Sequence, residues 1–172
     1  MTSYLEKAYF TSYALPSIAV ALSLVVVGIK VGKPIYQSHL ILIAGLIMLF
    51  LPVGLSPIKV ALQQVNPLIQ ESARTLGRGP IHTTTSITLP LIKRGLGMSF
   101  AIVFLVTMKE LPAIMILSPL DFNTLTMSIW SYSTEAFFAQ AAIPALMLIL
   151  ISTAPLGLLM GFSSEKLQDF KL

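Results

Sequence analysis

ESARTLGRGPIHTTTSITLP, residues 71–90, is the longest polar interval in a chain of 172 residues, 55% of which are hydrophobic. It stands between two long apolar blocks and is rich in charged residues, glycine and hydroxyl side chains. Only 10% of the whole chain is charged, whereas soluble domains carry about 25%. With a mean hydropathy of +0.85, a chain of this length could not bury its apolar surface in one soluble core. The sequence therefore predicts an integral membrane protein whose interval 71–90 meets water.

Four apolar blocks are predicted to be membrane-spanning helices, because each reaches or approaches the roughly 20 residues that a helix needs to cross a bilayer. They cover residues 13–31, 40–58, 95–117 and 139–162, and strand-like alternation is absent from the sequence. We therefore expect an all-α, polytopic transmembrane helical bundle that forms one domain over residues 1–172.

The distribution of basic residues predicts the orientation, since cytoplasmic loops of membrane proteins are enriched in lysine and arginine. If the segment 64–92 is cytoplasmic and the spans alternate, eight basic residues lie inside and three lie outside. Both termini are then expected in the cytoplasm and residues 118–138 on the outer side. The inner set is Lys7, Lys59, Arg74, Arg78, Lys93, Arg94, Lys166 and Lys171, and the outer set is Lys30, Lys33 and Lys109.

Several classes of function are excluded by what the sequence lacks. Without cysteine there is no disulfide, thiolate metal site or cysteine nucleophile. The net charge of +4 comes from residues at the ends of apolar runs, not from a basic stripe, so nucleic-acid binding is not expected. No phosphate-binding loop of the G-x-x-x-x-G-K-[ST] type and no nucleophile–base pair is present. We expect a protein that is not an enzyme and that binds neither metal nor cofactor itself.

A short helix is predicted at the start of the polar interval. Asn66 is suited to be its N-cap, Pro67 its first residue and Gly77 its end. Apolar side chains recur on it at helical spacing, which by itself fits any interfacial helix in a cytoplasmic loop. These side chains are Leu68, Ile69, Ala73 and Leu76.

The residue identities are more specific than the periodicity. The cytoplasmic signature of bacterial ABC importer permeases reads E-A-A, three residues, G, nine residues, I-x-L-P, and this chain resembles it at every spacing. Ser72 in place of an alanine is the one departure. The resemblance implies a type I importer permease core whose short helix couples to the ATP-binding subunit. It assigns the coupling to Glu71, Ser72, Ala73, Gly77, Ile87, Leu89 and Pro90.

Three further stretches are similar to the C-terminal part of ferric-iron permeases: MKELPA at 108–113, LSPLDFNTLT at 117–126 and AAIPAL at 141–146. Permeases for other substrates share parts of this pattern. Ferric permeases are usually much longer and contain two homologous halves, so this chain resembles the end of a second half. The bundle is therefore expected to be incomplete.

The resemblance implies a multi-pass protein of the bacterial inner membrane that imports ferric iron delivered by a periplasmic binding protein. Its expected partners are a dimer of ATP-binding subunits, which holds ATP and magnesium, a second permease half and the lipid bilayer. Another cargo (thiamine, an aminophosphonate, a polyamine or an oxyanion) and a membrane scaffold without transport activity are the alternatives.

Lys109 and Glu110 interrupt the third apolar block. A charge in mid-membrane costs about 2.5–3.5 kcal/mol and so faces protein or a watery cavity. In one interpretation Lys109, Glu110 and Pro112 line the translocation pathway or a gate. In the other, the span ends at Met108 and the charged pair lies at the membrane surface.

Overall fold

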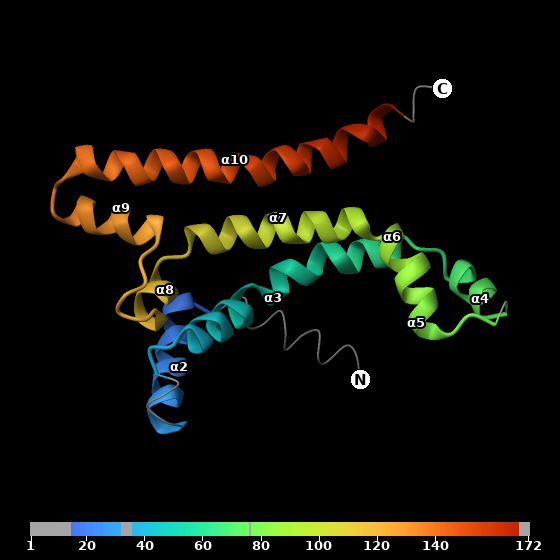
Figure 1. The fold of residues 1–172 in the computed structure, drawn as a ribbon, viewed down its shortest axis with the longest axis horizontal. Coiled ribbons are helices and arrows are strands. Elements are labelled where there is room, and N and C mark those ends of the chain that lie inside the picture. Colours follow the sequence, from blue (N-terminus) through green and yellow to red (C-terminus); the bar gives the residue numbers. More distant parts are fainter. Residues whose placement is uncertain (1–14, 32–35, 76, 169–172) are drawn as a thin grey trace.

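The computed structural model describes residues 15–31, 36–75 and 77–168, which form helices joined by turns and contain no strand. The predicted all-α architecture is confirmed. Figure 1 shows the arrangement of the helices. They are α2 (Ser17–Val31), α3 (His39–Gln63), α4 (Pro67–Thr75), α5 (Pro80–Thr83), a π-helix (Thr84–Thr88), α6 (Leu89–Leu91), α7 (Lys93–Lys109), α8 (Pro112–Leu117), α9 (Leu125–Thr134) and α10 (Phe138–Gln168).

Three long helices, α3, α7 and α10, form the body of the molecule, with α7 packed between the other two (Figure 1). The α4–α5 hairpin projects at one end of these helices, whereas α8 and α9 lie at the other end (Figure 1). The segments predicted to face opposite sides of the membrane are thus at opposite ends of the bundle. Residues 1–14 and 169–172, predicted to be cytoplasmic, lie outside the described part of the chain.

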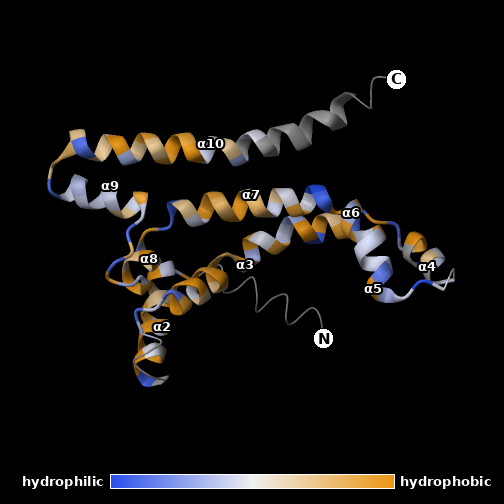
Figure 2. Ribbon diagram, in the orientation of Figure 1, coloured by the Kyte–Doolittle hydropathy of each residue, from blue (hydrophilic) through white to orange (hydrophobic). Residues whose placement is uncertain are grey.

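Hydropathy follows this division, with apolar residues along the long helices and polar residues concentrated on α5 and at the helix ends (Figure 2). Among the described residues, His39–Gln63 and Phe138–Pro155 are long and apolar enough to cross a membrane. A third span results if Pro80–Leu91 and Lys93–Lys109, which meet at 69°, count as one bent helix. Ser17–Lys30 is apolar but shorter. Two or three spans are therefore found where about four were expected.

The third predicted span, residues 95–117, is not one helix. Helix α7 ends at Lys109, Glu110 is extended with ψ 125°, and α8 begins at Pro112. Proline has no N–H to bond the carbonyl four residues earlier, and its ring clashes with that carbonyl. The broken segment then folds back against α2 and α3 instead of continuing α7.

Small residues allow α3 and α7 to approach closely. The Ser99 hydroxyl of α7 donates a hydrogen bond to the Gly54 carbonyl of α3. A Cβ atom at Gly54 would lie only 2.9 Å from Val103 Cγ2. Interfaces between membrane helices are commonly built in this way from glycine, alanine and serine.

A second cluster of buried side chains joins α8 to α2 and α3. Leu117 of α8 is 1% exposed, and a Cβ atom at Gly45 of α3 would lie 2.5 Å from its Cδ1. This packing holds α8 inside the bundle. The buried members are Ala21, Ile41, Leu42, Leu49, Ala113, Ile114 and Leu117.

Candidate functional site

The short helix of the polar interval, α4, has the ends that the sequence predicts. The Leu68 N–H donates to Asn66 Oδ1 at 3.0 Å, so Asn66 caps the helix, and Pro67 is its first residue. Gly77 follows the helix with φ +76°, a left-handed conformation that favours glycine. The Arg78 N–H then donates to the Ala73 carbonyl at 3.1 Å, which satisfies a carbonyl at the helix end.

The apolar stripe of α4 divides into an exposed part and a buried part. Leu68 is 63% and Ile69 is 42% exposed, and Glu71 is also exposed, whereas Ala73 is only 4% exposed. Because α4 packs against α5, where Thr83 is buried, the small Ala73 side chain serves the packing inside the hairpin. Leu76, the last predicted member of the stripe, lies outside the described residues.

Three of the seven predicted coupling residues therefore have structural roles within the hairpin. Ala73 has almost no surface left for a partner. Gly77 provides the turn and presents no side chain. The Ser72 hydroxyl donates to the Leu68 carbonyl at 2.8 Å, so serine fits the alanine position without an unsatisfied polar group. Of the residues predicted on α4, Glu71 is the one with an exposed charge.

The return arm of the hairpin contains a π-helix that the sequence analysis did not predict. The Leu89 N–H donates to the Thr84 carbonyl, five residues earlier. Pro90 has no N–H for the Ser86 carbonyl, and a wider turn relieves the clash between them. The proline of I-x-L-P is the sequence signal that could have indicated it.

The other signature residues of this arm lie between the π-helix and the membrane. Ile87 is half-buried, Leu89 is 46% exposed and Pro90 is exposed. At Ile92 the chain turns, so that the arm Pro80–Leu91 meets α7 at 69°. The arm is therefore a short angled extension of α7.

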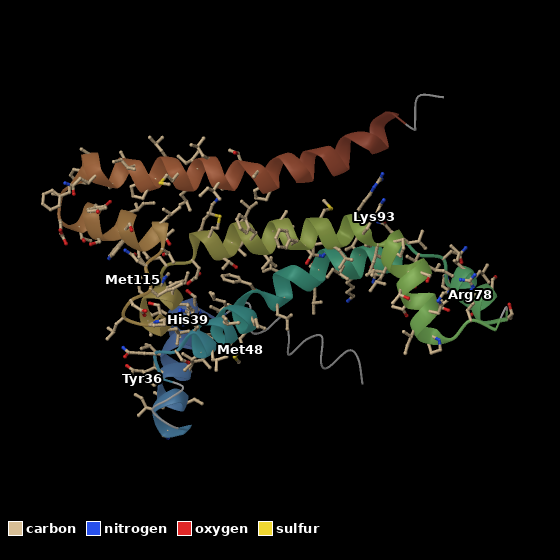
Figure 3. All side chains as sticks on the ribbon, viewed as in Figure 1. Tyr36, His39, Met48, Arg78, Lys93 and Met115 are labelled. Atoms are coloured by element: carbon tan, nitrogen blue, oxygen red, sulfur yellow. The ribbon has the colours of Figure 1, made fainter. Side chains whose placement is uncertain are left out.

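Two polar side chains of the hairpin contact each other, a pairing that sequence reasoning missed. Arg78 Nη1 lies 2.5 Å from His82 Nε2, and Ser86 Oγ lies 3.5 Å from His82 Nδ1. Figure 3 shows Arg78 in the hairpin, separated from Lys93 at the start of α7. Residues four apart face each other on a helix, so the spacing of His82 and Ser86 could have indicated their contact, whereas Arg78 precedes α5 and carried no such signal.

At the opposite end of the bundle, Glu110 binds the start of α8. Its Oε1 accepts a hydrogen bond from the Ala113 N–H at 3.0 Å, and its backbone carbonyl lies 3.5 Å from Thr126 Oγ1 of α9. Lys109 and Pro112 are exposed. Because α7 ends at Lys109, the charged pair lies at a helix junction and not within a continuous span. A role of Lys109, Glu110 and Pro112 in a pathway or gate stays a prediction.

We expect Glu110→Gln to leave the stability of the bundle almost unchanged and Glu110→Ala to lower it by about 1 kcal/mol. Glutamine keeps an oxygen that can accept from the Ala113 N–H, whereas alanine does not. Thermal unfolding of the purified protein in detergent measures the difference, with exposed Lys109→Gln as the control. If glutamine and alanine destabilised the bundle equally, the stabilisation would come from the charge of Glu110 and not from the hydrogen bond to the Ala113 N–H.

Two cavities among the described residues are apolar. A groove of about 340 Å³ lies between α3 and α7, and a second cavity of about 260 Å³ lies where α3, α7, α8, α9 and α10 meet. Leu46 and Thr107 line both, and the rest of each lining is largely aliphatic and aromatic. No group of three potential metal ligands (His, Cys, Asp or Glu) occurs among the described residues. This arrangement suits helix packing better than cation coordination.

Comparisons with known proteins agree with the signature. Residues 4–167 match the family of binding-protein-dependent transport system inner membrane components. The chain is 34% identical over 163 residues to the Fe(3+)-transport system permease protein FbpB 2 of Haemophilus influenzae. The aligned residues are 95% of this chain and 32% of that relative. It is 24% identical over 149 residues to the putative 2-aminoethylphosphonate transport system permease protein PhnV of Salmonella typhimurium. Here the aligned residues are 87% of this chain and 56% of that relative.

The chain thus spans about a third to a half of the length of these curated relatives. The match of the family nevertheless extends over nearly all of its residues, including the hairpin and the three long helices. The chain belongs to the family of binding-protein-dependent transport system inner membrane components.

Proposed function

We propose that this chain is the part of an ABC importer permease that couples ferric-iron transport to ATP hydrolysis by a partner subunit. The observation that carries the proposal is the α4–α5 hairpin, which holds the signature residues and projects beyond the long helices with Glu71 exposed (Figure 1).

The hairpin suits the transmission of force to the membrane. Closure of the partner subunits around ATP would push on α4, and the buried Ala73 would pass the displacement to α5. The π-helix and the bend at Ile92 connect this arm directly to α7, which packs along α3. Nucleotide then drives transport by favouring one of two arrangements of the membrane helices.

The proposed assembly contains partners that complete the permease. These are a dimer of ATP-binding subunits holding ATP and magnesium, a second permease half and a periplasmic binding protein. The assembly is placed in the bacterial inner membrane, with the hairpin and both termini in the cytoplasm. The greater length of the relatives supports the need for further membrane segments.

Ferric iron is the proposed cargo because the relative whose name specifies Fe(3+) is 34% identical over almost the whole chain. The relatives named for 2-aminoethylphosphonate are 24% identical, so an aminophosphonate is the second candidate. No group of three potential metal ligands among the described residues supports binding of the iron. The proposed route therefore involves surfaces shared with the second permease half.

We expect Glu71→Lys to reduce both retention of the ATP-binding subunit and uptake of radioactive ferric iron at least tenfold. Reversing an exposed charge at an interface costs several kcal/mol through like-charge contacts, and about 1.4 kcal/mol corresponds to tenfold. Co-purification and uptake are measured in cells whose own copy of the gene is deleted. Glu135→Lys is the matched control, because Glu135 is also exposed and follows α9 at the opposite end. Iron uptake that survives the deletion would contradict the cargo, and unchanged retention would contradict the coupling.

A further inference from the structure

Exposed aromatic side chains gather where α9 is followed by α10, at the end of the bundle opposite the hairpin (Figure 1). Trp130 is 51% and Phe138 is 70% exposed, and the neighbouring exposed rings are those of Tyr132 and Phe137. Tryptophan and tyrosine are enriched where a membrane meets water, because the ring is apolar while its N–H or O–H group can form hydrogen bonds. This corner therefore has the composition of a membrane–water interface.

The strongly apolar part of α10 begins at about the level of Trp130. Ile143, the first large aliphatic residue of α10, lies about 8 Å from the start of that helix at 1.5 Å per residue. Trp130 lies about 6 Å before the end of α9, which runs back along α10 (Figure 1). A hydrocarbon core of about 30 Å that starts at this level takes about 20 residues of α10 and ends near Phe162. The first charged residue of α10 is Glu165, so this position leaves no charge of α10 inside the hydrocarbon.

The ends of α9 are bonded within the protein, which allows this helix to lie partly in lipid. The Thr124 hydroxyl accepts a hydrogen bond from the Met127 N–H at 3.2 Å and so caps the start of the helix. At the other end, the Phe137 N–H donates to the Tyr132 carbonyl at 2.8 Å. The Thr134 hydroxyl donates to backbone carbonyls of its own helix. Polar groups that are bonded in this way cost less to remove from water.

We propose that the α9–α10 corner is an aromatic anchor in the phospholipid headgroup layer at the membrane surface opposite the hairpin. The ring of Trp130 lies at the boundary between headgroups and hydrocarbon, and Phe137 and Phe138 lie within the headgroup layer. This layer is about 6 Å deep on each side of the core, which matches the distance from Trp130 to the end of α9. The occupant is lipid and not a soluble protein, because from Phe138 on α10 is long and apolar enough to cross the membrane.

The anchor changes the position expected for the segment between α7 and α10. Leu125, the first residue of α9, lines a cavity together with Leu148 of α10. Leu148 lies about 8 Å beyond Ile143, so α9 begins inside the hydrocarbon layer. The sequence placed residues 118–138 on the outer side of the membrane, whereas in the proposed position α9 re-enters it. Glu110, whose backbone carbonyl contacts α9, is then below the membrane surface and must face protein or water.

Trp130 is the single tryptophan of the chain, so its depth can be measured without a substitution. The chain is reconstituted into vesicles of phosphatidylethanolamine and phosphatidylglycerol that carry bromine at defined depths of the acyl chains. We expect the fluorescence of Trp130 to be quenched most by bromine near the headgroup end of the acyl chains and little by iodide in the water. If iodide quenches most and brominated lipids do not, the corner stands in water and the anchor is wrong. Strongest quenching by bromine at the chain ends would also contradict it.

Two further tryptophan positions calibrate the depth, each in a chain that carries Trp130→Phe. Ile149 is exposed on α10 about 9 Å beyond Ile143, so Ile149→Trp should be quenched most by deeper bromine than Trp130 is. Phe138→Trp should be quenched most by bromine at the headgroup end. If Phe138→Trp and Ile149→Trp reported the same depth, α10 would run along the membrane surface at this corner, and the aromatic anchor would be wrong.

Discussion

Gly95→Leu is expected to destabilise the bundle by roughly 3 kcal/mol, because overpacking a close helix interface forces the backbones apart. Gly95 of α7 is buried against α3. A Cβ atom there would overlap the Cβ of Ala61 and lie 3.0 Å from the carbonyl oxygen of Pro57. A backbone carbonyl cannot move aside as a flexible side chain can. The two helices must therefore separate.

Thermal unfolding in detergent, followed by size-exclusion chromatography, measures this loss. Gly157→Leu in α10 is the matched control, since a Cβ atom at Gly157 meets nothing within 4 Å. Both changes add the same apolar side chain to a long helix, so membrane insertion should be equally favourable. A Gly95→Leu variant as stable as the Gly157→Leu variant would mean that α3 and α7 are not packed as described.

Gly77→Val is expected to reduce coupled ATP hydrolysis strongly. A side chain at φ +76° is strained by about 1–2 kcal/mol, and the β-branch of valine adds to this cost. The hairpin would relieve the strain by changing the turn, which moves α5 relative to α4. A change of this size alters the balance between hairpin conformations by a factor of about 5–30. Substrate-stimulated ATP hydrolysis in reconstituted vesicles should fall by a similar factor.

Gly79→Val provides a control two residues away. Gly79 has φ −66° and ψ 160°, which valine adopts readily, and a Cβ atom at either glycine meets nothing within 4 Å. The two variants therefore differ in backbone conformation and not in steric contact. If Gly79→Val reduced coupling as much as Gly77→Val, the effect would come from the added side chain and the turn would have no special role.

Much of the candidate site could be predicted from neighbouring residues alone. Asn66, Pro67 and Gly77 mark the ends of α4 because a cap, a proline and a left-handed glycine act within a few residues of where they stand. The apolar helices α3 and α10 could likewise be predicted, because the length of an apolar run is read from consecutive residues and does not depend on tertiary contacts. The family was also evident from the spacing of the signature.

The remaining features depend on contacts that no local pattern contains. The signature suggested that Ala73 meets a partner, but its burial against α5 is decided by how the hairpin closes. The sequence placed Glu110 within or at the end of a span. In the structure, Glu110 lies at the junction of α7 and α8, because its side chain accepts a hydrogen bond from the Ala113 N–H and α8 packs against α2.

By itself, then, the sequence determined the class of protein, its apolar helices and the ends of the short helix α4, because hydropathy, capping and turn preferences are properties of adjacent residues. Only the tertiary structure decided which side chains of that helix remain accessible, where the third apolar block breaks and how closely α3 and α7 approach. Ala61 and Gly95 are neighbours across 34 positions of chain, and such a contact is set by the packing of whole helices. The exposed surface of the hairpin is what that packing leaves uncovered.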